Sequence, residues 1–381
     1  MMEGTVVYPT EPIMIVKAPI FQAQLLESAL LCIVNFQTLI ATKASRIVRA
    51  AQPASVVEFG LRRAQAPDAS IYGARAAVIG GCDSTSNVLS CRMFDFQPKG
   101  THAHSWIMAF PSELEAFRAY AELFPDSCLL LVDTYDTLKS GIPNAIRVFD
   151  ELKAKGHKPT GIRLDSGDLA YLSKEARKML DAAGYPDCTV CASNSLDEYI
   201  VRDLILQGAR VDSFGIGENM ITAKSDPVFG GVYKLAAVKE DDGSYTPKMK
   251  LSESVEKMTI PCLKKVWRIY DEDGKAQADL ITMADEVVDT KNGITLFDPI
   301  ETWKECTYVN STARCISTPI YENGKRVYTS PNLADIRKFC KAQVGTLWDE
   351  VKRFENPHRY YVDLSRNLWD TRSELLKKLS K

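Results

Sequence analysis

The feature that most constrains the fold is an alternation of short apolar runs and helical patterns between Ser55 and Val238. The apolar runs occupy residues 56–59, 76–79, 129–132, 160–164, 189–192, 211–214 and 232–238. Apolar residues recur at helical spacing in most of the intervening stretches, at residues 113–123, 142–155, 168–183 and 196–207. Repeated βα units predict an α/β fold with parallel strands, and seven strand-like runs predict an irregular (β/α) barrel.

The segments on either side of this region have a different pattern. Residues 4–16 alternate apolar residues with two prolines, which indicates strands at a sheet edge, and residues 20–51 have helical spacing. We divide the helical stretch near Asn35 because it is longer than a typical globular helix. Strand-like runs return at 258–260 and 265–270, followed by helices at 334–339 and 373–379. We therefore predict a barrel from residues 55–245 and an α+β domain built from residues 1–54 and 246–381.

The composition is that of a globular protein with room for two domains, at 381 residues, 45% hydrophobic and 25% charged. A net charge of -2 argues against a nucleic-acid partner, so an anionic ligand needs a local cluster of basic side chains and backbone amides. Ten irregularly spaced cysteines and a start without signal-peptide features predict a reducing, cytoplasmic location. No uninterrupted apolar run reaches the roughly 20 residues of a membrane span, so no membrane partner is expected.

Polar clusters follow several of the strand-like runs. In a βα barrel the loops after the strands share one face, and this face carries the active site. The clusters are Arg62 and Arg63 after the first run, Asp133 to Thr137 after a middle run, Arg163 with Asp165, Ser166 and Asp168 after the next, and Gly215 with Gly217 after a late run. Their common position predicts a single site.

Arginine suits this site because its planar fork binds carboxylate or phosphate with two hydrogen bonds. Together Arg62, Arg63 and Arg163 predict a substrate with more than one anionic group, although salt bridges to nearby carboxylates would explain any one of them. The two glycines fit either a phosphate-binding turn or an ordinary tight turn. Neither a Walker A sequence nor a GxGxxG fingerprint occurs, so any use of ATP requires another kind of site.

Two of the four histidines, His102 and His104, lie two residues apart after Gly100. If this segment is extended, their side chains point to opposite faces, so only one of them can enter the cleft. An imidazole can act as a base, a nucleophile, a metal ligand or a buried structural group. We interpret His104 as the chemical residue and His102 as its structural neighbour.

Six motifs, EFGLRRAQ, GTHAHSW, LVDTYDT, GIRLDSGDL, FGIG and GGVYKL, resemble in this order those of the nicotinate phosphoribosyltransferases, and the resemblance covers essentially the whole chain. It implies a type II phosphoribosyltransferase barrel and transfer of the phosphoribosyl group of 5-phosphoribosyl 1-pyrophosphate to nicotinate. The products would be nicotinate mononucleotide and pyrophosphate, the first step of NAD salvage from nicotinate. The resemblance also implies coupling to ATP hydrolysis, Mg²⁺ as a cofactor and a homodimer.

The resemblance also implies roles for individual residues. His104 occupies the last position of the GTxAH pattern and would be phosphorylated by ATP, and Arg163 would face the nicotinate carboxylate. The implied catalytic residues are His104, Arg163 and Asp165, and the implied substrate-binding residues are Arg62, Arg63, Thr101, Ser105, Asp133, Ser166, Asp168, Gly215 and Gly217. No metal ligand is assigned.

Departures from the family pattern leave alternatives open. Family members carry a further N-terminal segment, with an aromatic residue that stacks on nicotinate across the dimer, and this chain begins after it. A truncated, non-catalytic, dimer-forming homologue is therefore one alternative, and a nicotinamide phosphoribosyltransferase is another. Arg163 and the GTxAH match favour the acid. A barrel aldolase is disfavoured because no lysine ends a strand. Smaller departures include Cys262 in place of glycine and Glu218 in place of threonine.

Overall fold

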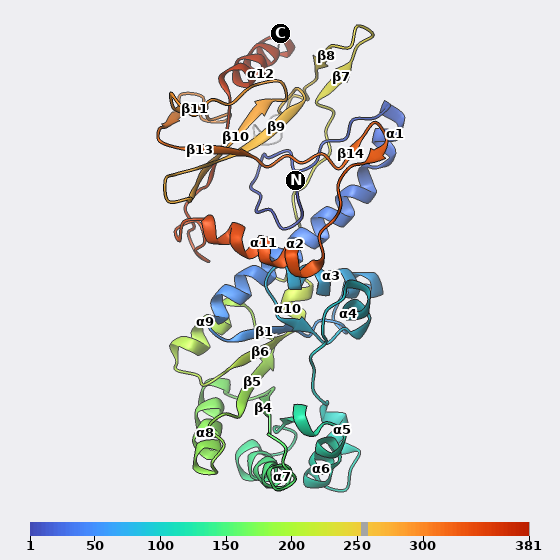
Figure 1. The fold of residues 1–381 in the computed structure, drawn as a ribbon, viewed down its shortest axis with the longest axis vertical. Coiled ribbons are helices and arrows are strands. Elements are labelled where there is room, and N and C mark those ends of the chain that lie inside the picture. Colours follow the sequence, from blue (N-terminus) through green and yellow to red (C-terminus); the bar gives the residue numbers. More distant parts are fainter. Residues whose placement is uncertain (253–257, 381) are drawn as a thin grey trace. The chain divides into compact units, whose positions relative to one another are not determined.

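The computed structural model describes residues 1–252 and 258–380. The chain divides into two compact units, one of Met1–Ile33 with Gly230–Lys381 and one of Val34–Phe229 (Figure 1). We call the first the sheet unit and the second the βα unit. The predicted domains, 1–54 with 246–381 and 55–245, have other bounds and stay a prediction.

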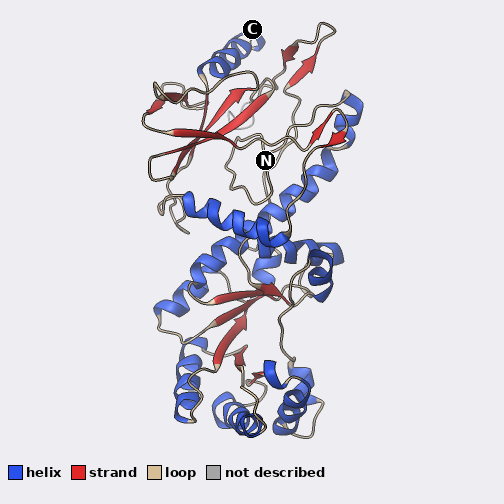
Figure 2. Cartoon of the chain, viewed as in Figure 1, coloured by secondary structure: helices blue, strands red, loops and turns tan. Residues whose placement is uncertain are grey.

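The βα unit contains a parallel sheet of six strands (Figure 2). In spatial order these are β2 (Ser84–Thr85), β1 (Ser55–Glu58), β6 (Ser213–Ile216), β5 (Thr189–Asn194), β4 (Gly161–Leu164) and β3 (Leu129–Leu131). Every neighbouring pair is parallel. Because β2 and β3 are not paired with each other in the described residues, the sheet is a half-barrel and not a closed one. The α/β fold class is confirmed in this irregular form.

Helices cover the sheet, and the four predicted from periodicity are present. Those four are α6 (Glu113–Leu123), α7 (Ile142–Ala154), α8 (Leu169–Ala182) and α9 (Glu198–Leu206). The others are α2 (Glu27–Ala51), α3 (Pro67–Ile79), α4 (Val88–Phe94), α5 (His104–Met108) and α10 (Glu218–Ile221). Side chains of Ser112, Asp168 and Asp197 cap α6, α8 and α9, which explains where these helices begin.

Two predicted strands of the sheet are wrong. Residues 76–79 form the last turn of α3, whose second half is buried on all sides, so its sequence lacks amphipathic periodicity. The true strand, β2, consists of two polar residues and gives no apolar signal. Of residues 232–238, only the end enters a strand, β7 (Ala237–Lys239), which pairs with β8 (Tyr245–Pro247) in the sheet unit.

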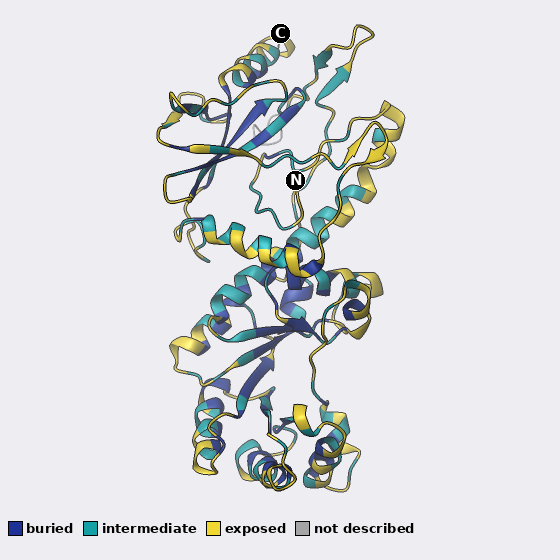
Figure 3. Ribbon diagram, in the orientation of Figure 1, coloured by how far each residue is buried: buried dark blue, intermediate teal, exposed yellow. Residues whose placement is uncertain are grey.

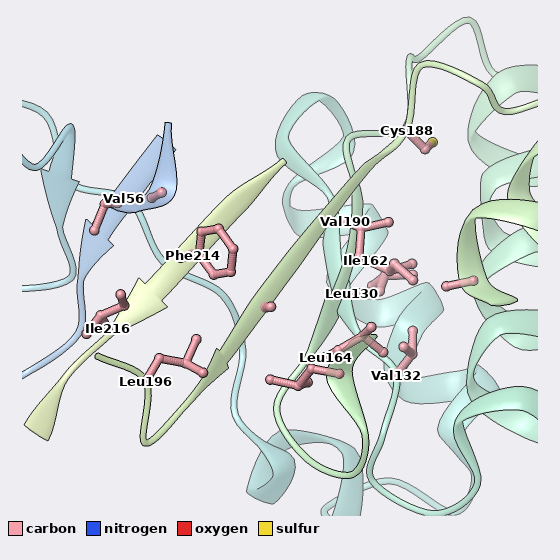
Figure 4. Close-up of a cluster of buried hydrophobic side chains, with 14 of the residues drawn as sticks. Val56, Leu130, Val132, Ile162, Leu164, Cys188, Val190, Leu196, Phe214 and Ile216 are labelled. Carbon is pink, nitrogen blue, oxygen red and sulfur yellow. The ribbon is translucent and has the colours of Figure 1, made fainter. Parts of the chain in front are cut away.

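The core of the βα unit is formed by alternate residues of the central strands (Figure 4). Leu130, Ile162, Leu164, Val190 and Phe214 are fully buried there. Burial of this apolar surface is the main force that holds the strands under their helices. The polar residues at the strand ends are not part of this apolar core.

The sheet unit contains a mixed six-stranded sheet. Its spatial order is β12 (Glu305–Tyr308), β11 (Ile294–Phe297), β16 (Tyr361–Leu364), β10 (Ala276–Met283), β9 (Lys264–Tyr270) and β13 (Thr312–Cys315). A short hairpin, β14 (Tyr321–Glu322) with β15 (Lys325–Arg326), and the helices α1 (Ile20–Leu25), α11 (Leu333–Thr346) and α12 (Arg366–Leu379) complete it. This separate unit agrees with the predicted second α+β domain.

Three local predictions outside the barrel are wrong. Residues 4–16 and 258–260 form no strand in the described structure, and the helical stretch divides at Leu26 rather than near Asn35. After that division α2 continues unbroken for 25 residues. Its later half is anchored by Ile40, Ala44 and Ile47, which are buried, so packing stabilises a helix longer than the typical length.

Charged residues also form part of the core of the sheet unit. Arg268 on β9 and Asp279 on β10 are register partners, and both side chains are fully buried. The guanidinium donates from Nε to Asp279 Oδ1 at 2.8 Å and from Nη2 to Oδ2 at 2.6 Å. Tyr360 donates to Asp279 at 3.0 Å, and Arg268 also donates to the Val6 carbonyl at 2.8 Å. The two charged groups therefore bind each other through two hydrogen bonds and further bond to Tyr360 and Val6, which links the two strands in this register.

The segment Ile20–Ala51 is long and apolar enough to cross a membrane by length and composition, with a mean hydropathy of 1.6 in its best window. Scattered Gln, Ser and Asn residues interrupt the apolar run in this segment, so the match rests on the average hydropathy, and the expectation of no membrane partner stays a prediction. A core helix of a soluble protein passes the same test. The part before Val34 is mostly exposed, as Figure 3 shows.

Candidate active site at the carboxyl ends of the parallel strands

Half of the predicted site residues come together at the carboxyl ends of β3, β4 and β5. Arg163 lies in β4, Asp165 and Ser166 follow it directly, and Asp133 follows β3. His104 is the first residue of α5, with Thr101 just before it. This convergence follows from parallel pairing, which places the ends of all the strands on one side of the sheet.

Arg163 is held by a hydrogen bond from each of its three nitrogens. Nε donates to Ser193 Oγ at 2.9 Å, Nη2 donates to Asp165 Oδ1 at 3.2 Å, and Nη1 donates to Thr101 Oγ1. The guanidinium also lies over the Phe59 ring, 5.5 Å from its centroid. A guanidinium has five N–H groups, so two remain for a ligand once these contacts in the described structure are made. Arg163 is thus oriented and partly free.

Asp165 is ionised more readily than an ordinary aspartate. Its partial burial opposes charge, but the hydrogen bonds from Ser193 and Arg163 and the positive charge of Arg163 together lower its pKa. Ser193 Oγ lies 2.5 Å from Asp165 Oδ1, and His104 Nε2 lies 3.6 Å from Oδ2. One oxygen is therefore bound to neighbouring side chains, and the other faces His104.

Asp133 ties the loop after β3 to the loop after β4. Its Oδ2 accepts the backbone N–H of Asp165 at 2.9 Å and the hydroxyl of Ser166 at 2.6 Å. Its Oδ1 is buried and has no hydrogen-bond partner among the described residues. An oxygen of this kind is costly unless a ligand, a water or a metal ion completes it.

His104 lies between a hydroxyl and two carboxylates. Nδ1 is 3.1 Å from Thr134 Oγ1, whereas Nε2 is 3.6 Å from Asp165 and 4.0 Å from Asp133. Its side chain is 39% exposed. The ring is therefore fixed at Nδ1 and open to an incoming group at Nε2.

His102 has the environment of a core residue. It is 7% exposed, its Nε2 accepts the backbone N–H of Leu131 at 3.2 Å, and its ring meets Tyr120 edge-on at 4.7 Å. Burial lowers its pKa to about 4, so the ring is neutral at pH 7. This agrees with its interpretation as a structural neighbour.

The remaining predicted residues do not join the Arg163 cluster through any hydrogen bond in the described structure. Arg62 and Ser105 are exposed, and Arg63 lies 3.7 Å from Glu218. Asp168 caps α8 by accepting the N–H of Tyr171 at 2.9 Å. The cap gives Asp168 a structural role, and its contact with substrate stays a prediction.

Gly215 and Gly217 have a packing reason to be glycine. A Cβ at Gly215 would lie 2.3 Å from the Phe59 ring, and one at Gly217 would lie 2.8 Å from the Phe59 carbonyl oxygen. Close approach of β1 and β6 therefore requires both residues, and phosphate binding by this turn stays a prediction.

Glu58 lies beside the site and is not among the predicted site residues. Its carboxyl is fully buried at the end of β1, where it accepts the N–H of Gly60 and the hydroxyl of Thr85 at 2.5 Å. Burial raises the pKa of Glu58 to about 7. Glu58 thus holds the start of the turn that carries Arg62 and Arg63.

The Glu58 environment gives a testable pH dependence of stability. Because the folded pKa is raised from 4.5 to about 7, the folded state binds the extra proton, and stability falls as pH rises between these values. Glu58→Gln removes this titration while keeping a similar shape. We expect its melting temperature to rise relative to the unmodified chain from pH 4.5 to 7 and then level off, equivalent to at most about 3 kcal/mol. A difference between the two proteins that stays constant over this range would contradict the assignment.

Comparison with known proteins gives consistent matches. The family model described as the nicotinate phosphoribosyltransferase (NAPRTase) family matches residues 54–259, and the nicotinate phosphoribosyltransferase C-terminal domain matches residues 263–372. The chain is 46% identical to nicotinate phosphoribosyltransferase of Bacillus subtilis over 98% of this chain and 76% of that protein. It is 36% identical to the Dictyostelium discoideum enzyme over 97% and 71%, respectively.

Two solved structures resemble the whole fold. Human nicotinic acid phosphoribosyltransferase superposes with a TM-score of 0.86 at 28% identity, covering 98% of this chain and 81% of that one. Nicotinate-nucleotide pyrophosphorylase from Pyrococcus furiosus superposes with a TM-score of 0.63 at 26% identity, covering 84% and 73%. The half-barrel therefore has the topology of these phosphoribosyltransferases.

Proposed function

The chain belongs to the nicotinate phosphoribosyltransferase family, and from this premise we propose how its strand-end residues carry out the reaction. The enzyme transfers the phosphoribosyl group of 5-phosphoribosyl 1-pyrophosphate to nicotinate and releases pyrophosphate, in NAD biosynthesis. The family uses ATP. The two alternatives, a truncated non-catalytic homologue and a nicotinamide phosphoribosyltransferase, are therefore not favoured.

Arg163 binds the nicotinate carboxylate in this proposal. The supporting observation is that three contacts fix its guanidinium while two N–H groups stay available. Two parallel N–H donors match the two oxygens of a carboxylate, which an uncharged amide does not offer. This geometry favours nicotinate over nicotinamide.

Asp165 stabilises the positive charge that develops on the sugar as pyrophosphate departs. Its lowered pKa keeps it anionic at neutral pH, and its loop is fixed through Asp133. A preorganised charge of this kind stabilises a transition state without reorganisation during the reaction. The nicotinate nitrogen supplies its own lone pair, so no general base is needed.

Mg²⁺ would bind with the pyrophosphate group. Within residues 1–252 and 258–380, no cluster of three or more His, Cys, Asp or Glu could hold a metal alone. Mg²⁺ commonly binds through one or two carboxylates plus substrate phosphates, and the partnerless Oδ1 of Asp133 fits that requirement. Asp133 and Asp165 would hold the ion, which would neutralise charge on the leaving group.

His104 accepts the phosphoryl group of ATP in this proposal. In the tautomer whose Nδ1–H is donated to Thr134, at 3.1 Å, the Nε2 lone pair attacks the γ-phosphorus, a new N–P bond forms, the bond to the bridging oxygen breaks, and ADP leaves. Hydrolysis of the phosphohistidine later returns the free imidazole and phosphate. Asp133 and Asp165 lie next to His104 and would transmit the change in charge on phosphorylation to the phosphoribosyl site.

A homodimer in the cytoplasm is also part of the proposal. An open groove of about 640 Å³ in the βα unit is lined by Leu61, Val88 and Leu89, whose side chains are 46%, 65% and 53% exposed. Exposed apolar residues gathered around one groove suit contact with a second copy. Sedimentation equilibrium should give twice the chain mass, and Leu89→Glu should shift it toward the monomer.

The activity is tested by incubating the purified chain with nicotinate, 5-phosphoribosyl 1-pyrophosphate, Mg²⁺ and ATP. Nicotinate mononucleotide should form, and replacing nicotinate by nicotinamide should lower the rate. Omitting Mg²⁺ should abolish the reaction. Absence of product in every condition would favour the non-catalytic alternative.

Arg163→Lys tests the carboxylate contact. Lysine keeps the charge but loses the two parallel donors, so we expect the KM for nicotinate to rise about tenfold to a hundredfold, the loss of a hydrogen bond to a charged group. The KM for 5-phosphoribosyl 1-pyrophosphate should change much less. An equal rise for both substrates would place the defect in the fold instead.

A further inference from the structure

Ser193 is a buried polar residue inside the sheet that no sequence motif singled out. It lies in β5, is 2% exposed, and its register partner in β6 is Gly215. Its hydroxyl oxygen accepts from Arg163 Nε at 2.9 Å and lies 2.5 Å from Asp165 Oδ1. Ser193 therefore touches both Arg163 and Asp165.

The direction of these hydrogen bonds is fixed by chemistry. Nε of arginine is always a donor, so Ser193 Oγ must accept there, and its single proton is then available for the Asp165 carboxylate. The Leu164 carbonyl lies 3.4 Å from Oγ and is the weaker acceptor. The resulting relay runs from the Arg163 cation through the serine hydroxyl to the Asp165 anion.

The Ser193 hydroxyl affects both the orientation of Arg163 and the charge of Asp165. Nε is the nitrogen nearest the side-chain stem, so a bond at Nε sets the plane of the guanidinium and hence the direction of its terminal N–H groups. The hydroxyl also stabilises the charged form of Asp165, contributing to its lowered pKa. Without the hydroxyl, Nε would lose its acceptor, and only the contacts of Nη1 and Nη2 and the Phe59 ring would hold the plane of the guanidinium.

We propose that Ser193 is a positioning residue for nicotinate recognition, which aims the Arg163 fork at the substrate carboxylate. The proposal rests on the proposed role of Arg163 and deepens it. Ser193 is then a determinant of the selectivity for nicotinate over nicotinamide, because only a correctly oriented guanidinium donates two hydrogen bonds to a carboxylate.

Ser193→Ala is the test variant. We expect its KM for nicotinate to rise about tenfold, the loss of a hydrogen bond to a charged group, with little change in the KM for 5-phosphoribosyl 1-pyrophosphate. The preference for nicotinate over nicotinamide should narrow.

Ser173→Ala is the matched control. Ser173 is also a fully buried serine, but its hydroxyl donates to Ala170 O at 3.1 Å and accepts from Arg210 N at 3.0 Å in α8, with no contact to Arg163. It should alter the melting temperature without changing either KM or the preference for nicotinate over nicotinamide. This separates loss of a buried hydroxyl from loss of the relay.

The possible results separate the role of Ser193 from the role of Arg163. A nicotinate-selective loss in Arg163→Lys without one in Ser193→Ala overturns the role of Ser193 alone. An unchanged nicotinate KM in both variants overturns the proposed role of Arg163 and with it that of Ser193. Equal losses for both substrates with an unchanged preference for nicotinate over nicotinamide in Ser193→Ala also overturn the proposal.

Discussion

Replacing His104 by alanine should abolish the stimulation of the reaction by ATP, so that rates with and without ATP become equal. The imidazole is placed to act as a nucleophile, because Nδ1 lies 3.1 Å from Thr134 and the side chain is 39% exposed. Transfer of the phosphoribosyl group needs orientation and charge from Arg163 and Asp165, which the substitution leaves in place. Basal transfer should therefore persist.

The phosphorylated intermediate gives an independent measurement of the same assignment. Incubation with ATP labelled at the γ-phosphate should yield an acid-labile protein phosphate that is missing in His104→Ala. His157→Ala is the matched control, because His157 is a surface residue paired with Asp126 at 2.9 Å, away from the strand ends. Full ATP stimulation or retained labelling in His104→Ala would show that another residue carries the phosphate.

Sequence periodicity could predict the fold where one face of an element is buried. The helices α6, α7, α8 and α9 were predicted almost to their ends because each has one apolar face and most have a capping residue. The helix α3 was mistaken for a strand in its second half because burial on all sides removes the periodic signal. Strand β2 is too short and polar to give one.

The sequence predicts the part of the site that is formed by polar residues at the ends of strands. Asp133, Arg163 and Asp165 meet because parallel strands end together. The argument that separated His102 from His104 assumed an extended segment, whereas His104 begins α5. The two rings differ in burial because His102 precedes the helix and lies in the core, whereas His104 begins the helix and lies at the strand ends.

Ser193 and the buried role of Glu58 could not be predicted because their function depends on tertiary contacts. A serine within an apolar strand has the same local pattern whether or not an arginine from the next strand reaches it. Cys262 did carry a local signal, since it stands where the family usually has glycine. Its φ is +75°, a left-handed conformation that favours glycine.

Removing the carboxylate of Asp279 should lower the free energy of unfolding of the sheet unit by about 3–5 kcal/mol. Asp279→Ala would leave the Arg268 guanidinium, which is fully buried, without the two hydrogen bonds that neutralise it. Water cannot replace them without opening the sheet between β9 and β10. Urea unfolding followed by tryptophan fluorescence measures the loss, since Trp267 lies in the same strand.

An exposed ion pair of the same unit provides the control. Arg366 and Glu305 approach to 3.8 Å, with side chains 56% and 62% exposed, so Glu305→Ala should change stability little because solvent already screens the pair. Replacing both buried partners, Arg268→Met with Asp279→Leu, should recover part of the loss, because no unpaired charge remains in the core. If Asp279→Ala were as stable as Glu305→Ala, the buried pair would not hold the two strands together.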